Sequence, residues 1–311
     1  MHAHLALILL STLSQVQPAV TIQGDSGFRS LAISPDGKRL LTGDDNKIAR
    51  VFDLNTGKEI LVLKGHTGAV VGVAFSPDGK RVFTAGAEGT VASWDLTTGV
   101  QLWSLRAGGQ GVGARSLDVG PDGRSIAVGL TSGEALLVDA REGKSIAQAV
   151  AHNRPMSGVA FSPDGKRIAT IGEDGKMLLW DAAALKQLRQ FTAHERAGRA
   201  IGFSPDGRFL ATGGDDRNVK LFDTDTGREI RVLAGHRLPV TSVVFAPDGK
   251  TVASAGEEGA VIVWETESGK PVLNPAGSHT GEVTAIAYSP DGRMLASAGG
   301  DRTVRVWKIG Q

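Results

Sequence analysis

The tripeptide Pro-Asp-Gly recurs seven times in this chain at almost constant spacing. Its prolines are Pro35, Pro77, Pro121, Pro163, Pro205, Pro247 and Pro290, at intervals of 42, 44, 42, 42, 42 and 43 residues. A second marker follows each proline by 17 residues: Phe52, Trp94, Val138, Trp180, Phe222, Trp264 and Trp307. Self-similarity at a period of about 20 to 50 residues is typical of chains built from stacked structural repeats. The sequence therefore predicts seven units.

Each unit is expected to hold four short β-strands, as residues 161–191 illustrate. After one apolar strand, Pro-Asp-Gly turns the chain and Arg167–Ile171 runs back. The turn Glu173-Asp174-Gly175 leads to a third strand, Met177–Trp180, and Thr-Gly turns introduce the fourth strand in several units. Proline presets φ for a tight turn and glycine accepts positive φ, while alternating Val, Ile and Leu mark half-buried strands. The fold class is therefore all-β.

A four-stranded sheet cannot bury both of its faces alone, so each unit needs a neighbour on either side, and a ring of seven supplies them. The last unit stops at its third strand, Val304–Ile309, whereas Ala19–Gln23 forms a spare strand before the first unit. We predict a seven-bladed β-propeller that the N-terminal strand closes by joining the last blade.

The chain from Ala19 to Ile309 resembles the WD-repeat (tryptophan-aspartate repeat) propeller family. The motifs that carry this resemblance are Gly65-His66, Gly235-His236, Trp94-Asp95 and Trp180-Asp181, repeated in register. A single dipeptide of this kind is weak evidence, but seven aligned units are strong. The resemblance implies blades with adaptor or scaffold roles, usually without chemistry.

Five histidines each precede a hydroxyl residue by 18 positions and an acid by 22. The sets are His66, Thr84, Glu88; His152, Thr170, Asp174; His194, Thr212, Asp216; His236, Ser254, Glu258; and His279, Ser297, Asp301. These are the residue types of a hydrolase triad. One catalytic site needs one set, however, so five copies around a ring favour a structural role. This set resembles the hydrogen-bond tetrad of His, Ser/Thr, Asp and Trp that rigidifies each blade in that family.

The fourth and seventh units carry the complete tetrad. Their residues are His152, Thr170, Asp174 and Trp180, and His279, Ser297, Asp301 and Trp307. The second and sixth units have Glu for Asp, the fifth has Phe222 for Trp, and the first lacks the histidine and carries Asn46 and Phe52. The third unit retains no tetrad and has Gln110, Val128, Ser132 and Val138. Its preceding loop, Ala107–Gly113, is glycine-rich and two residues longer, so we expect the softest blade here, or else a ligand-binding loop.

Candidate binding residues lie on the face where the second-to-third strand turns meet the loops between blades, which the resemblance makes the usual ligand surface. Five residues past the histidine position are Arg29, Val71, Arg115, Ser157, Arg199, Thr241 and Thr284. The residue before each tetrad acid is Asp45, Ala87, Thr131, Glu173, Asp215, Glu257 or Gly300. From these rings we predict a partner-binding site of Arg29, Arg115, Arg199, Asp45, Glu173, Asp215, Glu257, Thr241 and Thr284.

Arginine presents five donors in a planar fork, so this site could hold an anionic segment of a protein or peptide partner. The alternative is that Arg29 pairs with Asp45 and Arg199 with Asp215 inside their own blades. Only Arg115, opposite the uncharged Thr131, would then be free.

Composition argues against several other classes. The 34 basic and 33 acidic residues give a net charge of +1, so no nucleic-acid partner is predicted, and the chain has no cysteine. The histidines are spread over five blades, so we expect neither a metal site nor a cofactor. Residues 141–145 end like a phosphate loop but lack its first glycine. Thr97-Thr98-Gly99 with Trp103 resembles the tryptophan-docking repeat of quinoprotein propellers, in one unit only.

The first 14 residues include an apolar run, Leu5–Leu10, that is too short to span a bilayer. Thr12 and Ser14 suit a signal-peptide cleavage site, so we predict a leader over residues 1–14, a propeller over 15–311, and export to the periplasm. The alternative is a frayed N-terminus on a cytoplasmic protein. The predicted function is a non-catalytic interaction scaffold. The alternative is a propeller enzyme, a hydrolase or quinone-dependent dehydrogenase, that uses the central funnel.

Overall fold

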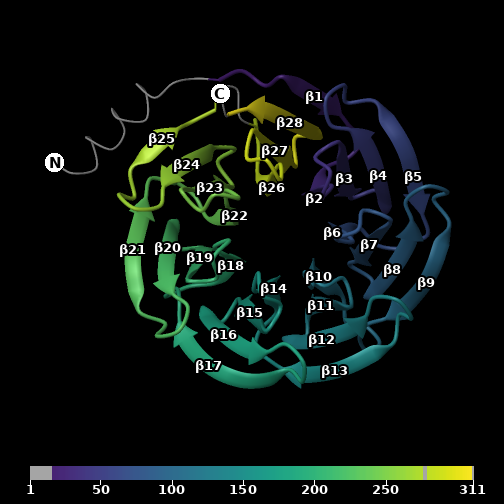
Figure 1. Ribbon diagram of the computed structural model, residues 1–311, viewed down its shortest axis with the longest axis horizontal. Coiled ribbons are helices and arrows are strands. Elements are labelled where there is room, and N and C mark those ends of the chain that lie inside the picture. The colour runs from purple at the N-terminus through teal and green to yellow at the C-terminus, as the bar shows by residue number, and fades with distance from the viewer. Residues whose placement is uncertain (1–15, 276–278, 310–311) are drawn as a thin grey trace.

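The computed structural model describes residues 16–275 and 279–309, which form a closed ring of seven four-stranded antiparallel sheets (Figure 1). The predicted leader therefore lies outside the described residues. We number the sheets as blades: blade one holds β2–β5, two β6–β9, three β10–β13, four β14–β17, five β18–β21, six β22–β25, and seven β26–β28 with β1. The predicted seven-bladed propeller is confirmed.

The strands take four positions from the channel outward. The innermost strands are β2 (Phe28–Ile33), β6 (Val70–Phe75), β10 (Ala114–Val119), β14 (Met156–Phe161), β18 (Gly198–Phe203), β22 (Val240–Phe245) and β26 (Val283–Tyr288). The second strands are β3 (Arg39–Asp44), β7 (Arg81–Gly86), β11 (Ser125–Leu130), β15 (Arg167–Gly172), β19 (Phe209–Gly214), β23 (Thr251–Gly256) and β27 (Met294–Gly299). The third strands are β4 (Ile48–Asp53), β8 (Thr90–Asp95), β12 (Glu134–Asp139), β16 (Lys176–Asp181), β20 (Asn218–Asp223), β24 (Val261–Glu265) and β28 (Thr303–Lys308). The outer strands are β5 (Glu59–Lys64), β9 (Gln101–Arg106), β13 (Ser145–Val150), β17 (Lys186–Thr192), β21 (Glu229–Ala234), β25 (Pro271–Leu273) and β1 (Val20–Gln23).

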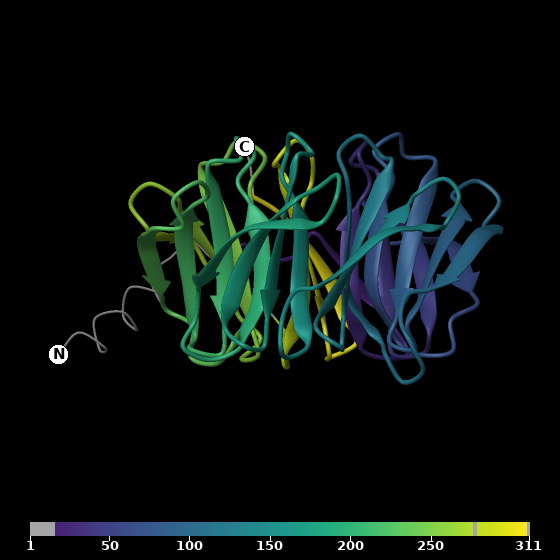
Figure 2. The ribbon, with the colours of Figure 1, turned by 90° about the horizontal axis from the view of Figure 1, so that it is seen from below.

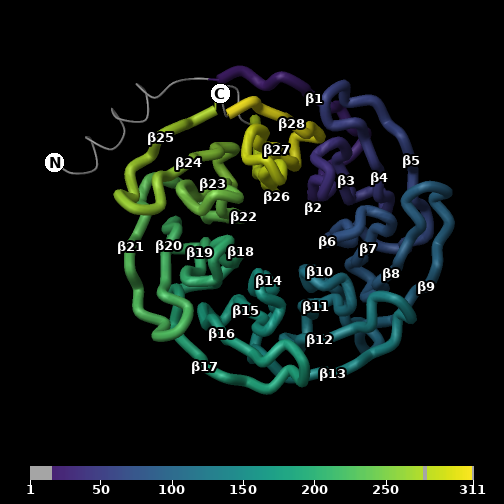
Figure 3. The backbone as a smooth tube through the Cα atoms, viewed as in Figure 1, coloured from purple at the N-terminus to yellow at the C-terminus, as the bar shows by residue number. Residues whose placement is uncertain are grey.

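The strand β1 closes the ring. It pairs with β28 from Val20 opposite Val306 to Gln23 opposite Thr303, and the Ala19 amide donates to the Val306 carbonyl at 2.7 Å. The tube in Figure 3 shows this N-terminal segment running along the outside of β28. The predicted closure is confirmed.

Loops gather on two opposite faces, with the strands running between them (Figure 2). We call the top face the one that carries the turns between second and third strands. In blade four, the Glu173 amide donates to the Pro155 carbonyl and the Ala193 amide to the Gly175 carbonyl, both at 2.9 Å. These bonds hold each such turn against the loops between blades. The Pro-Asp-Gly turns lie on the opposite, bottom face.

Each Pro-Asp-Gly turn has its own hydrogen bonds, as blade four shows. The Ser162 hydroxyl donates to Asp164 at 2.6 Å, and the Lys166 amide donates to the same carboxylate at 3.0 Å. Gly165 has φ of 69°, a conformation that L side chains rarely adopt. The repeat that defines the sequence therefore fixes the seven tight turns of the bottom face.

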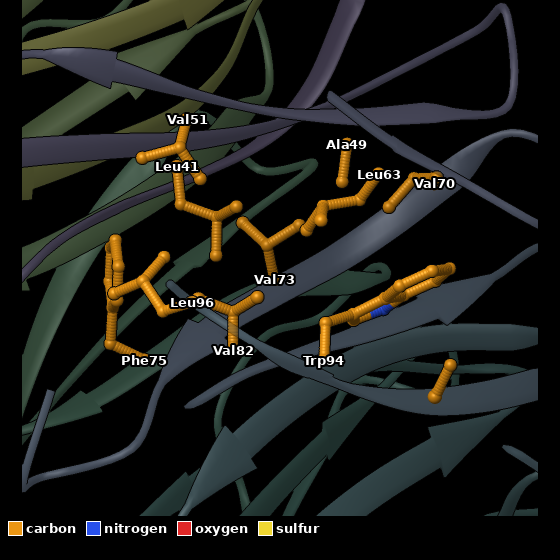
Figure 4. Close-up of a cluster of buried hydrophobic side chains, with 11 residues drawn as sticks. Leu41, Ala49, Val51, Leu63, Val70, Val73, Phe75, Val82, Trp94 and Leu96 are labelled. Atoms are coloured by element: carbon orange, nitrogen blue, oxygen red, sulfur yellow. The ribbon is translucent and has the colours of Figure 1, made fainter. Parts of the chain in front are cut away.

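The hydrophobic core is divided into clusters between neighbouring blades. Figure 4 shows one of them, where Leu41 and Val51 of blade one meet Val73 and Trp94 of blade two. Because every sheet buries both faces against its neighbours, the hydrophobic core lies between blades and not within any one blade.

A further contact joins neighbouring blades at their outer strands. The Trp103 indole of blade two lies over Gly143 of blade three and donates to the Ala140 carbonyl at 3.2 Å. A Cβ atom on Gly143 would lie 2.5 Å from that ring. Phe191 covers Gly227 in the same way. Of the residues that resemble a tryptophan-docking repeat, Trp103 thus packs on a glycine of the next blade, whereas Gly99 is covered by Leu61 of blade one.

Candidate functional site

The polar set of blade four forms a buried hydrogen-bond chain. The Trp180 Nε1–H donates to Thr170 Oγ1 at 3.0 Å, and His152 Nε2 lies 3.0 Å from the same oxygen. His152 Nδ1 lies 2.9 Å from Asp174 Oδ1. Every donor is matched if the indole donates to threonine, threonine to a neutral imidazole, and Nδ1–H to the carboxylate. Burial lowers the pKa of His152, which favours that neutral form.

The hydrogen-bonded residues of this tetrad cannot act as a nucleophile and its base. Thr170 is fully buried and His152 nearly so, so a substrate cannot reach the hydroxyl. The threonine oxygen also already accepts the indole N–H. The arrangement fits a structural strut.

Glutamate in place of aspartate preserves the hydrogen bonds of the tetrad. In blade two, Glu88 Oε1 lies 2.6 Å from His66 Nδ1, while His66 Nε2 and Trp94 Nε1 lie 2.7 and 2.9 Å from Thr84 Oγ1. Blade six repeats these contacts with His236, Ser254, Glu258 and Trp264, each at 2.7 Å. The longer carboxylate side chain reaches the same ring nitrogen.

The seventh tetrad is incomplete, which corrects the prediction from sequence. His279 lies 2.6 Å from Ser297 Oγ and 2.8 Å from Asp301. The Trp307 indole nitrogen, however, is buried with no hydrogen-bond partner among the described residues. Blade seven therefore has the histidine half of the chain without the indole half.

A glycine at the end of the second strand makes room for the histidine. A Cβ atom on Gly172 would lie 2.7 Å from the His152 ring, and the five histidine-bearing blades all have glycine there. The two blades without histidine have a side chain instead. In blade one, Asp44 is buried, accepts the Ile48 amide at 3.0 Å and pairs with Arg50. In blade three, Leu130 is fully buried. The missing ring is replaced in each case.

In the loop of blade three, residues 108–112 replace residues 152–154 of blade four, since Ala107 and Gly113 make the backbone bonds of Ala151 and Pro155. A Cβ atom on Gly89 would lie 2.2 Å from the Val112 carbonyl oxygen, just as one on Gly133 would lie 2.2 Å from that of His152. The two-residue insertion therefore lies within residues 108–112, of which 109–111, including Gln110, are exposed. The loop is anchored at Val112, whose side chain packs on the blade core.

The channel mouth on the top face is a hollow of about 370 Å³. Its lining comes from all seven blades: Arg29, Asp45, Ala69, Val71, Ala87, Arg115, Ser157, Arg199, Thr241, Glu282 and Thr284. Six predicted site residues are therefore brought together here. Glu173 and Asp215 line the adjoining hollow between blades four and five instead.

All three predicted arginines are paired. Arg29 Nε lies 2.6 Å from Asp45 and Arg199 Nε 2.6 Å from Asp215, as the in-blade alternative predicted. Arg115 pairs with Glu173 of blade four. The expectation of a free Arg115 is therefore wrong, because a carboxylate from the next blade reaches it where Thr131 could not. This pair stays accessible, since the arginine side chain is 40% exposed.

The two predicted threonines are bonded to backbone. The Thr284 hydroxyl donates to the Phe28 carbonyl of blade one at 2.8 Å, and the Thr241 hydroxyl donates to the Val283 carbonyl of blade seven. Each hydroxyl thus ties its blade to the next through its proton, and only its oxygen is left to accept a bond from a partner.

Two acids near the channel mouth make no ion pair among the described residues. They are Glu257, which was predicted, and Glu282, which was not. Burial raises the pKa of Glu257, and the charge of Glu282 raises it further. The side of the mouth at blades six and seven is therefore negative. Glu282 stands immediately before an innermost strand, a place that the two sequence rings did not include.

Two family models match the sequence. A model described as WD domain, G-beta repeat, matches residues 227–265 and 270–308. A model described as outer membrane protein assembly factor BamB matches residues 11–232, more than half of the chain. The chain belongs to the WD-repeat β-propellers and to the BamB family. For this WD-repeat propeller, the WD model covers β21 to β28, and the BamB model covers β1 to β20 and part of β21.

The residues described for this WD-repeat propeller contain no group of three or more His, Asp or Glu that could hold a metal ion. No described helix is long and apolar enough to cross a membrane.

Proposed function

We propose that this WD-repeat propeller is a non-catalytic scaffold that binds a protein partner over the channel mouth of its top face. The observation that carries the proposal is the convergence of all seven blades on that mouth. Ion pairs and backbone bonds already hold its side chains, so a partner would meet a rigid, preorganised surface. Paired arginine and carboxylate groups still present exposed edges for further hydrogen bonds.

The enzyme alternatives have less support. A hydrolase would need an accessible nucleophile, whereas the hydroxyls of the tetrads are buried. A quinone cofactor that carries carboxylates would need free cations at the mouth. Arg29, Arg115 and Arg199 are already paired with carboxylates, and Glu257 and Glu282 add negative charge. The mouth residues therefore do not fit such a cofactor.

The BamB match supports a periplasmic setting for this scaffold. The description of that family is an outer membrane protein assembly factor, and a leader over residues 1–14 would deliver the chain to the periplasm. We propose export, cleavage near Ser14, and a role as a scaffold within an assembly of proteins.

The experiment is an affinity capture from the native organism with three baits that all melt like the native fold. The baits are wild type, a top-face variant Arg29→Ala/Arg115→Ala/Arg199→Ala, and a bottom-face variant Lys38→Ala/Lys80→Ala/Lys166→Ala that loses the same charge. We expect a partner that the top-face variant loses and the bottom-face variant keeps, with purified partner binding weakened by about tenfold or more. A partner with the opposite pattern would contradict the proposal.

A further inference from the structure

A second hollow on the top face lies between blades four and five, beside the channel mouth. Its volume is about 630 Å³ and charged side chains make up most of its lining. Arg199 lines both this hollow and the mouth, so the two are continuous. A partner seated over the mouth would therefore reach it.

Three of the four acids in this hollow already have partners within the protein. Glu173 pairs with Arg115, and Asp215 with Arg199. Asp174 accepts from His152 at 2.9 Å. Arginines balance the charges of Glu173 and Asp215, whereas Asp174, bonded to a neutral imidazole, and Glu195 have no cation paired with them among the described residues.

The cations of the hollow are uncommitted. Arg154, Lys176 and Arg196 line it, and none makes an ion pair within residues 16–275 and 279–309. Arg154 and Arg196 are exposed and each follows a tetrad histidine by two residues. The other histidine-bearing blades have Gly68, Leu238 and Gly281 at that position. The free positive charge of this kind is thus confined to two adjacent blades.

We propose that this hollow binds an acidic segment of the protein partner, with Arg154, Lys176 and Arg196 holding its carboxylates. The proposal rests on the proposed scaffold function and names the chemistry of the segment bound. Charge-assisted bonds from arginine to carboxylate are among the stronger hydrogen bonds, and exposed cations steer an anion toward them. The negative side of the mouth, at Glu257 and Glu282, would direct such a segment toward blades four and five.

A short peptide fits these charges better than a nucleic acid. A polyphosphate backbone extends beyond one hollow, and here it would meet the carboxylates of the channel mouth. The net charge of the chain is only +1, so there is no broad basic surface for it. One or two carboxylates, by contrast, match this hollow, where the three unpaired cations outnumber the two acids that lack a paired cation.

The test measures fluorescence anisotropy of a labelled octaglutamate peptide at low salt, with a labelled DNA duplex and phosphatidylglycerol vesicles as other anionic probes. The variant Arg154→Glu/Arg196→Glu reverses two cations of the hollow. Lys47→Glu/Arg302→Glu is its control, because it makes the same charge change at exposed top-face turns of blades one and seven. We expect the hollow variant to weaken peptide binding by about tenfold or more and the control to change it less than about threefold.

Equal losses in the two variants would overturn the proposal, because they would show attraction by net charge alone. So would tighter binding of the DNA or the vesicles that depends on the same arginines. The captured partner separates this proposal from the scaffold function. If that partner binds Arg154→Glu/Arg196→Glu normally but not the mouth variant, the scaffold function is supported and the proposed binding of an acidic segment in the hollow is wrong. If it binds both variants normally, the proposal that the partner binds the top face is also wrong.

Discussion

Blades three and four are neighbours with the same arrangement of four strands and turns, yet different interactions stabilise their interiors. Blade four buries a polar chain from Trp180 through Thr170 to His152. At the matching positions of the tryptophan and the threonine, blade three has Val138 and Val128, both fully buried. Neither interior has an orphaned group at these positions. A propeller blade can therefore be built from a fully satisfied polar chain or from none.

A third position, at the end of the second strand, also differs between the two blades. Gly172 leaves room for the histidine ring in blade four, and Leu130 fills that room in blade three. The expectation that blade three is the softest rested on counting lost hydrogen bonds. It stays a prediction, but the buried leucine and two buried valines give this blade an apolar source of stability that the count ignored.

The largest effect should come from emptying that position in blade three. Leu130→Ala is expected to lower the free energy of unfolding by about 3 to 5 kcal/mol, because it removes apolar contacts and leaves a cavity. The measurement is denaturant unfolding. Ile60→Ala is a matched control, because that aliphatic side chain is 51% exposed and its loss should have little effect. Similar losses in both variants would show that blade three is not held by its apolar interior.

The joint between the two blades should depend on pH. Asp118 of blade three accepts the Phe161 amide of blade four at 2.7 Å and its neighbour Val119 at 2.9 Å. Burial raises its pKa to about 6, against the effect of these two bonds. As pH falls from 7 toward 4, the carboxyl gains a proton in the folded state before it does in the unfolded chain. Its contribution to stability should therefore rise, by up to about 3 kcal/mol.

The comparison with Asp118→Asn isolates this effect. Other carboxylates act in the opposite direction, since the Ser162 hydroxyl and the Lys166 amide lower the pKa of Asp164. Unfolding free energies of wild type and Asp118→Asn should be measured from pH 7 to pH 4 in steps. A difference between the two proteins that does not change with pH would remove Asp118 as the titrating group.

The polar design can be tested on two tryptophans with different surroundings. Trp180→Phe should cost about 1 to 3 kcal/mol, because the Thr170 oxygen loses its indole donor inside a buried chain. Trp307→Phe is the matched variant, since that indole N–H has no partner among the described residues and its loss removes packing alone. Thermal and denaturant unfolding would compare them. Equal costs would mean that the hydrogen bond itself contributes nothing.

Sequence predicted most of this fold because the information is local and repeated. Pro-Asp-Gly fixes each bottom turn, and the spacing from His152 to Thr170 and Asp174 places three side chains in one blade. Contacts between blades were harder to predict. The ion pair between Glu173 and Arg115 joins residues that are 58 positions apart, so no spacing within one unit could predict this contact. A signal was present for blade three, since Leu130 stands where histidine-bearing blades have glycine.

The smallest effect concerns Arg115 and Glu173, which join blades three and four at the top face. Both side chains are partly exposed, and exposed ion pairs contribute little because water and salt screen them. Arg115→Ala should therefore change stability by less than about 1 kcal/mol, and less still at high salt. A double-mutant cycle with Glu173→Gln would give the coupling energy between the two side chains. If it is near zero, this pair adds nothing to the joint, and Asp118 with the apolar contacts between the two blades must hold it. A coupling well above 1 kcal/mol that persists in high salt would instead make Arg115 a true strut, and its loss would then affect partner binding through the position of blade four.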